Sequence, residues 1–123
     1  MAKILLIEDD QILLGMYKTM FQNHGFAVST AVNGEEGLSS ALTLHPDLIL
    51  LDIRMQGMDG LTMMQKLRED EWGENAKIII LTNLDINDER LSAIVKHQPS
   101  YYLIKANTKP EDVLEKVEET LGS

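Results

Sequence analysis

Short runs of hydrophobic residues alternate along the chain with longer stretches in which hydrophobic and polar positions are mixed. The short runs are rich in β-branched residues and are bounded by turn-forming residues, which is typical of strands. They predict five strands, at residues 4–7, 27–31, 48–51, 78–81 and 101–104. The interval between consecutive strands leaves room for one helix and its two loops.

The longer stretches carry hydrophobic residues three or four positions apart, which is the spacing of one helix face. In the first stretch these residues are Ile12, Met16 and Met20, and we expect both methionines to lie in the core. The same spacing in the last stretch is made by Val113, Val117 and Leu121.

Helix boundary signals agree with this assignment. Gly25 follows the first helical stretch, as a residue that ends a helix would. Asn33 with Glu36 resembles a capping pair at the start of the second helix, and Asp59-Gly60 can begin the third.

Strands that alternate with helices predict an α/β fold, in which a parallel sheet is covered by helices on both faces. The run at 78–81 is hydrophobic at every position, as expected of a central parallel strand buried on both sides. We therefore predict a doubly wound (βα)5 domain that occupies residues 1–123. In such sheets, functional residues gather at the carboxyl ends of the strands.

The amino-acid composition excludes several classes of function and agrees with the predicted fold. The 123 residues are 44% hydrophobic and 25% charged, which fits one globular domain. A formal net charge of −9 disfavours binding to nucleic acid or to an anionic membrane surface. The chain has no Cys, so disulfides, thiolate catalysis and Cys-ligated metals are excluded. The apolar runs are too short for a membrane span, and the start does not resemble a signal peptide, so we expect a cytoplasmic protein.

Polar residues follow four of the predicted strands, and a parallel sheet would bring them to one edge. They are Glu8, Asp9 and Asp10, then Asp52, then Thr82 and Asn83, and finally Lys105. Carboxylates that share a small space repel each other unless a cation offsets their charge, and hard oxygen ligands suit Mg²⁺. Together with a Lys and a Thr that can bind anionic oxygens, they resemble a Mg²⁺-assisted phosphoryl-transfer site with a carboxylate nucleophile.

Each of these features alone has a simpler explanation. An acidic run after a strand is usually a solvated helix N-terminus, where Asp is favoured by the helix dipole. Lys105 alone would be a surface charge, and Thr82 an ordinary turn hydroxyl. Their coincidence at one predicted edge of the sheet is what favours a chemical site.

The chain resembles the receiver domains of two-component response regulators over essentially its whole length. Five ordered motifs carry the resemblance, at residues 4–10, 47–55, 57–60, 80–83 and 102–105. It implies a flavodoxin-like fold with strand order 2-1-3-4-5, similar to stand-alone chemotaxis receivers. It also implies a signalling switch that catalyses only its own phosphorylation and dephosphorylation and is otherwise not an enzyme.

The resemblance also implies a role for each matching residue. Asp52 would accept a phosphoryl group from a phosphohistidine of a sensor histidine kinase or phosphotransfer protein. Asp9 would bind Mg²⁺ directly and Glu8 largely through water, and Asp52 and the backbone carbonyl of Arg54 would complete the protein ligands. Lys105 would pair with Asp52 or with a phosphoryl oxygen.

Two further residues match the family's conformational switch. Thr82 would hydrogen-bond the phosphoryl group and move its loop inward, and Tyr102 would then turn inward. The surface of the fourth helix, fifth strand and fifth helix would carry the signal to a downstream protein target or output domain. Arg54 and Leu84 flank the position where the family tunes hydrolysis, and we expect them to set an unusual phosphoryl lifetime.

The sequence departs from the family pattern at two positions. Gln56 stands where the family usually has Pro in the phosphorylation-site loop, and Ala106 stands where it usually has Pro after the Lys. The family's Lys-Pro bond is cis, but a non-proline cis bond costs about 2.5–4 kcal/mol, which favours a trans peptide after Lys105.

Other functions fit less well. A flavodoxin-like module that binds a small phosphorylated ligand would be repelled by Glu8, Asp9 and Asp10, and a dehalogenase-type hydrolase needs an Asp where this chain has Arg54. The remaining alternative is a receiver-shaped docking scaffold that does not depend on phosphorylation. Met55 and Met58 are candidates for partner contacts. The sequence leaves open whether the chain works alone or is part of a longer regulator.

Overall fold

The computed structural model describes residues 1–83 and 88–122, and the predicted elements are all present. The strands are β1 (Lys3–Ile7), β2 (Ala27–Ala31), β3 (Leu48–Leu51), β4 (Ile78–Thr82) and β5 (Tyr101–Ile104). The helices are α1 (Gln11–Asn23), α2 (Gly34–Leu44), α3 (Gly60–Arg68), α4 (Asp88–Lys96) and α5 (Pro110–Gly122). Two short 3₁₀ turns, η1 (Gly73–Asn75) and η2 (Lys105–Asn107), precede β4 and follow β5.

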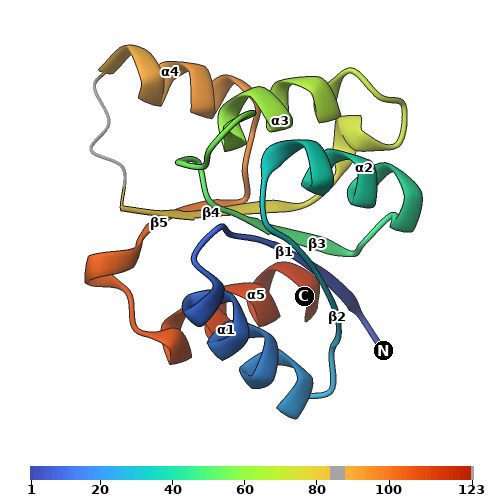
Figure 1. Cartoon of the computed structure of the whole chain (residues 1–123), viewed down its shortest axis with the longest axis vertical. Helices are drawn as coiled ribbons and strands as arrows, with labels where there is room; N and C mark the ends of the chain where they lie inside the picture. Colours follow the sequence, from blue (N-terminus) through green and yellow to red (C-terminus); the bar gives the residue numbers. More distant parts are fainter. Residues whose placement is uncertain (84–87, 123) are drawn as a thin grey trace.

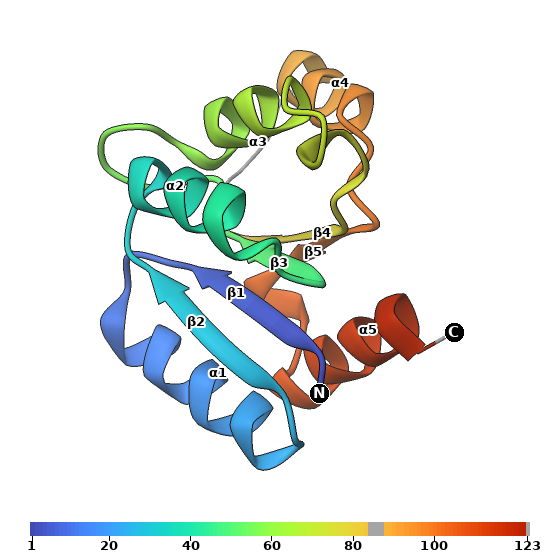
Figure 2. The same cartoon turned by 90° about the vertical axis from the view of Figure 1, so that its right-hand side faces the viewer.

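All strand pairs are parallel, and the strand order is β2-β1-β3-β4-β5. Helices α2, α3 and α4 cover one face of the sheet, whereas α1 and α5 cover the other (Figures 1 and 2). The predicted α/β flavodoxin-like architecture is confirmed. As a result, the carboxyl ends of β1, β3, β4 and β5 lie along one edge of the sheet.

The core has two halves because successive strand residues point to opposite faces. In β3, Ile49 and Leu51 belong to the half under α2, α3 and α4, whereas Leu48 and Leu50 belong to the half over α1 and α5. The central strands β1, β3 and β4 are buried on both sides, which explains their continuous hydrophobic runs.

Helix α1 does not bury the stripe that its four-residue spacing suggests. Ile12 is 88% exposed and Met16 is 41% exposed, so the expectation of a core position for Met16 was wrong. Leu14, Tyr17 and Phe21 face the sheet instead. Both stripes have helical spacing, and the one with the two aromatic rings buries more area.

The predicted helix boundaries are confirmed by capping contacts. The Asn33 side chain accepts a hydrogen bond from the Glu36 backbone N–H at 2.8 Å, and Asp59 accepts one from Thr62 at 2.8 Å. Gly25 adopts a φ of +89°, a conformation that favours glycine, just after α1. None of the helices described here is both long and hydrophobic enough to cross a membrane.

Candidate functional site

The polar residues predicted to converge do meet at one edge of the sheet. They surround a hollow of about 230 Å³ that opens at the carboxyl ends of the strands. Its walls are made by Glu8, Asp9, Asp10, Asp52, Arg54, Thr82, Asn83 and Lys105. Residues far apart in the sequence therefore form one polar site.

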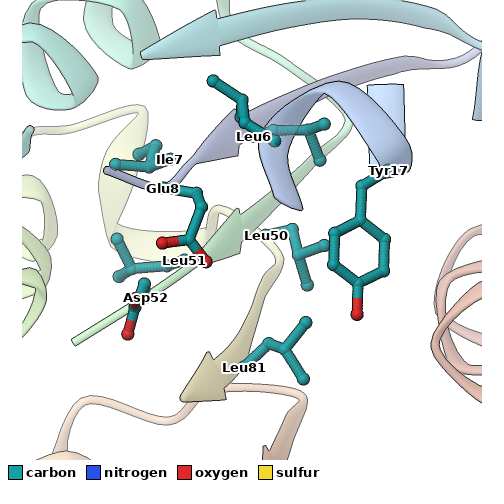
Figure 3. A pocket seen from close by; sticks show the side chains of 9 residues that line it. Leu6, Ile7, Glu8, Tyr17, Leu50, Leu51, Asp52 and Leu81 are labelled. Atoms are coloured by element: carbon teal, nitrogen blue, oxygen red, sulfur yellow. The ribbon is translucent and has the colours of Figure 1, made fainter. Parts of the chain in front are cut away.

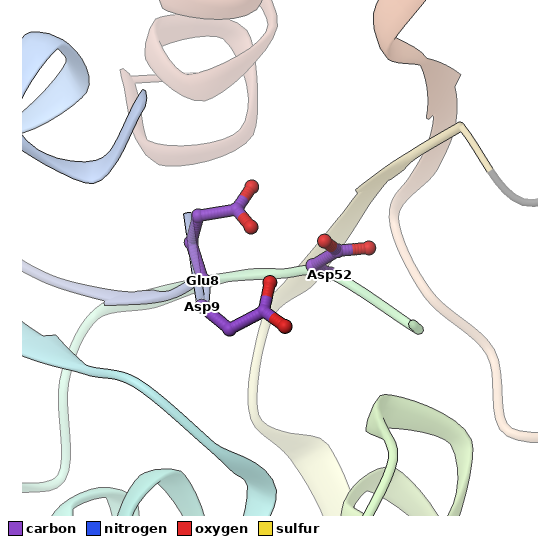
Figure 4. Close-up of side chains that lie close together, drawn as sticks. All are labelled: Glu8, Asp9 and Asp52. Carbon is purple, nitrogen blue, oxygen red and sulfur yellow. The ribbon is translucent and has the colours of Figure 1, made fainter. Parts of the chain in front are cut away.

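Three carboxylates form the acidic part of this site. Glu8 and Asp9 follow β1, and Asp52 follows β3, so the pairing of β1 with β3 places them together (Figure 4). One oxygen from each lies within 4.8 Å of the others, close enough to share a metal ion. Glu8 and Asp52 are only 7% and 6% exposed, whereas Asp9 is exposed. Three hard oxygen donors, one of them open to solvent, fit Mg²⁺ binding.

Lys105 is the cation of the site. Its Nζ lies 3.0 Å from Asp52 Oδ2, and it also forms an ion pair and hydrogen bond with Glu8 Oε1. Burial alone would lower the pKa of Lys105, but its hydrogen bonds to the two carboxylates raise that pKa above the usual value. Lys105 therefore stays charged and bridges β1 and β3 from its position just after β5.

Glu8 has a strongly perturbed acidity. Burial and the nearby charge of Asp52, opposed by the hydrogen bond from Lys105, together raise its pKa to about 7. Glu8 and Asp52 also line a small cavity of about 10 Å³ that lies between them and the hydrophobic core (Figure 3). Its walls are mainly hydrophobic and include Leu50, Leu81 and Tyr17. A divalent cation would favour the charged form of Glu8.

The loop between β3 and α3 is tightly held near Asp52. Arg54 donates its backbone N–H to Asp52 Oδ1 at 3.2 Å, while the Arg54 side chain is exposed. At the other end, Gly60 N–H donates to the Ile53 carbonyl at 2.8 Å, and Gly60 lies so close to the Asp52 carbonyl that a Cβ would be 2.2 Å from that oxygen. Met55 is buried in the core, so its expected role in partner contacts was wrong.

Thr82 and Tyr102 lie on the same face of the sheet. Tyr102 on β5 is in register with Ile80 on β4, and Thr82 is two residues beyond Ile80, so all three point to the side covered by α2, α3 and α4. Thr82 is fully buried at the end of β4, and Tyr102 is half-buried against the core. Leu84 lies outside the described residues.

Asn83 makes a contact that the sequence did not suggest. Its side-chain oxygen accepts a hydrogen bond from the Ala106 backbone N–H at 2.9 Å. The expected trans peptide after Lys105 is present, because the described residues contain no cis peptide bond. A proline at 106 would have no N–H to donate, so this departure from the family pattern is the only signal that could have indicated the contact.

Comparison with models of known protein families shows which family this chain belongs to. The family model of the response regulator receiver domain matches residues 4–118. The chain belongs to this family. Receiver domains of two-component systems share a phosphorylation-dependent switch as their family function, and they are not enzymes in the usual sense.

Individual relatives agree with this assignment. The nitrate/nitrite response regulator protein NarL of Escherichia coli is 36% identical over 115 residues, which cover 92% of this chain and 51% of NarL. A CheY-like receiver domain from Methanospirillum hungatei has a TM-score of 0.90 at 26% identity, covering 98% of this chain and 94% of that chain. TrrA of Thermotoga maritima, solved in complex with Mg²⁺-BeF, has a TM-score of 0.84 at 31% identity, covering 98% and 100% of the two chains.

The curated relatives are longer than this receiver domain. The chain spans about half or less of their full length, with 51% of NarL, 46% of the Synechocystis regulator RpaA and 20% of the Caulobacter regulator PleD. The similarity therefore concerns the receiver domain of these proteins and not their remaining parts.

Proposed function

We propose that this receiver domain accepts a phosphoryl group on Asp52 from the phosphohistidine of a sensor histidine kinase or a phosphotransfer protein. The observation that carries the proposal is the convergence of Glu8, Asp9 and Asp52, with Lys105 paired to Glu8 and Asp52. The unit that acts is the whole stretch 1–123, because the sheet and all five helices contribute to the two halves of its core.

Asp52 is the nucleophile of this reaction. One of its carboxylate oxygens attacks the phosphorus, the bond between phosphorus and the imidazole nitrogen breaks, and that electron pair leaves with the imidazole. Two groups hold the Asp52 carboxylate, the Arg54 backbone N–H and the Lys105 ammonium. These contacts fix its orientation, and positioning accounts for much of the rate in phosphoryl transfer.

The residues that would hold Mg²⁺ are Asp9, Asp52 and the Arg54 carbonyl, with Glu8 acting largely through water. When bound, Mg²⁺ would neutralise the carboxylates and the oxygens of the incoming phosphoryl group. The exposed position of Asp9 leaves one side of the hollow open for solvent and for the phosphoryl donor. The Mg²⁺-BeF complex of the similar Thermotoga receiver supports this choice of metal.

Lys105 and Thr82 bind the phosphoryl oxygens after transfer. Lys105 exchanges its carboxylate partners for a phosphoryl oxygen, which its flexible side chain allows. The Thr82 hydroxyl donates to another oxygen and draws the end of β4 toward the site. Tyr102 shares the sheet face of Thr82, so it turns inward when Thr82 moves, which changes the surface around α4 and β5.

Partner proteins bind the phosphorylated domain, and hydrolysis then removes the phosphoryl group. The altered surface binds a downstream protein target or an output domain, and no direct contact with nucleic acid or membrane is involved. Water then hydrolyses the acyl phosphate, a reaction that the domain catalyses on itself, at a rate set by Arg54 and Leu84. Two-component signalling of this kind takes place in the cytoplasm.

Intact-mass spectrometry after incubation with acetyl phosphate tests the proposal. We expect one phosphoryl adduct on the wild-type chain in the presence of Mg²⁺, and none in its absence or on Asp52→Asn. Asp47→Asn is a matched control, because Asp47 is an exposed Asp that precedes β3 at the opposite edge of the sheet.

A docking scaffold that does not depend on phosphorylation predicts a different result. It would show no adduct with acetyl phosphate or with a phosphorylated histidine kinase, although circular dichroism shows a folded chain. That outcome would overturn the proposed phosphorylation of Asp52.

A further inference from the structure

Glu35, in the first turn of α2, contacts the far side of the loop that follows Asp52. Its Oε1 accepts a hydrogen bond from the Met58 backbone N–H at 3.0 Å. Gly57 has a φ of +75°, and a Cβ added there would stand 3.2 Å from the same oxygen. The Glu35 carboxylate therefore lies directly against the backbone at residues 57 and 58.

The start of α2 also contacts this backbone through Gly34. A Cβ added to Gly34 would be 2.2 Å from the Met58 carbonyl oxygen, so the two backbones are in close contact. The hydrogen bond and the close approach come from neighbouring residues of α2 and fall on the same residue of the loop. They fix the loop relative to α2.

This outer part of the loop lacks the rigidity that a proline would provide. Residue 56 is Gln and Gly57 follows it, so no proline ring restricts φ at either position and Gly57 has no Cβ to limit the backbone. Gln56 and Gly57 are both exposed and have no core packing to hold them. The order of this stretch therefore depends on its neighbour Met58, which packs against the core and whose backbone N–H is held by Glu35.

We infer that Glu35 is a positioning residue for the metal site. It holds the loop at Met58 and thereby keeps the Arg54 carbonyl beside Asp52, an inference that rests on the function proposed above. Without the Glu35 hydrogen bond the loop samples other conformations. The apparent metal affinity is then the intrinsic affinity multiplied by the fraction of chains in the competent conformation, so it decreases as that fraction decreases.

Metal binding to three variants separates the hydrogen bond from the charge. Mn²⁺, a hard cation that suits the same oxygen ligands, is followed by electron paramagnetic resonance without any phosphodonor. We expect Glu35→Ala to bind Mn²⁺ about threefold more weakly than wild type, since it loses one hydrogen bond. Glu35→Gln keeps an acceptor and should bind like wild type. Glu36→Ala removes an exposed charge from the same helical turn and should also bind like wild type.

Hydrogen exchange at the Met58 amide gives a second readout that does not involve metal. We expect faster exchange in Glu35→Ala and wild-type exchange in Glu35→Gln. Equal Mn²⁺ affinity of Glu35→Ala and wild type would overturn the inference and leave the proposed function intact, as would a Glu35→Gln variant as weak as Glu35→Ala. A wild-type chain that binds no Mn²⁺ would instead overturn the metal site and the proposed function together.

Discussion

The side-chain oxygen of Asn83 lies 2.9 Å from the backbone nitrogen of Ala106 and accepts its hydrogen bond. This bond links the residue after Thr82 to the residue after Lys105. It therefore joins the segments that follow β4 and β5 next to Thr82 and Lys105. A chain with proline at 106 could not form it.

We predict that Asn83→Ala is phosphorylated faster by acetyl phosphate than wild type. The bond is present in the unphosphorylated chain, and in the proposed mechanism phosphorylation draws Thr82 and its neighbour toward Asp52. Removing the bond lowers the cost of that movement, by an amount that corresponds to about a threefold rate increase. Asn75→Ala, at an exposed Asn before β4, should react at the wild-type rate. A slower reaction of Asn83→Ala would contradict this prediction.

Lys105→Met should destabilise the chain in the absence of metal. The substitution leaves the buried carboxylates of Glu8 and Asp52 next to each other with no cation between them. We expect the free energy of unfolding at pH 7 to fall by about 2 kcal/mol, because an unpaired buried charge is costly. Urea denaturation measures this change.

Lys116→Met is the matched control for the Lys105 variant. Lys116 pairs with Glu119 at 3.4 Å on the exposed side of α5. Exposed ion pairs of this kind contribute about 0–1 kcal/mol, so the control should lose clearly less stability than Lys105→Met. Equal losses in the two variants would mean that the pairing of Lys105 contributes little to folding.

Arg68 at the end of α3 stabilises the packing of three segments. Its guanidinium donates to the Gly73 and Ala76 carbonyls at 2.8 and 2.7 Å, and to the His97 and Gln98 carbonyls at 2.9 and 3.3 Å. Arg68→Met keeps much of the hydrocarbon but removes every donor. We expect a loss of about 3 kcal/mol in the free energy of unfolding, again by urea denaturation, because the carbonyls of buried Gly73 and Ala76 and of half-buried His97 lose a charged partner. Arg54→Met, at an exposed side chain, should change that free energy by less than about 0.5 kcal/mol.

Local sequence patterns predicted most of the fold. Three strands have the predicted bounds, while β1 begins one residue earlier and β4 ends one residue later. The added residue of β4 is Thr82, a polar residue that hydrophobic patterning excludes but that the strand pairing keeps in register with Ile104. The buried face of α1 was misassigned because Ile12 and Met16 repeat with the same helical spacing as the residues that are buried. Only packing against the sheet distinguishes the two stripes.

The sequence predicted only those contacts of the site that follow from residues at the carboxyl ends of the strands. Because the carboxyl ends of parallel strands share an edge, the meeting of Glu8, Asp52 and Lys105 followed from the predicted fold. The contacts of Glu35 with Met58 and of Asn83 with Ala106 did not follow, since each joins two loops or helix ends whose relative placement depends on tertiary packing. The second partner of Lys105, Glu8, was also not predicted.

The pKa of Glu8 predicts how the stability of the metal-free chain depends on pH. Its pKa rises from 4.5 to about 7 on folding, so the folded chain binds a proton at Glu8 more tightly than the unfolded chain. This contribution to stability is fully present below pH 4.5 and is lost as the pH rises through about 7. We expect the melting temperature of the metal-free wild type to fall by about 5 °C more between pH 5.5 and 8 than that of Glu8→Gln.

The comparison with Glu8→Gln is needed because another group titrates in the same range with the opposite sign. Burial lowers the pKa of His97, so that residue makes the folded chain more stable as the pH rises, equally in both proteins. Saturating Mg²⁺ should raise the melting temperature of the wild type more at pH 8 than at pH 5.5, because the metal binds the ionised carboxylate. If the melting temperatures of the wild type and Glu8→Gln changed equally with pH, Glu8 would be ionised throughout this range. Its burial would then not raise its pKa.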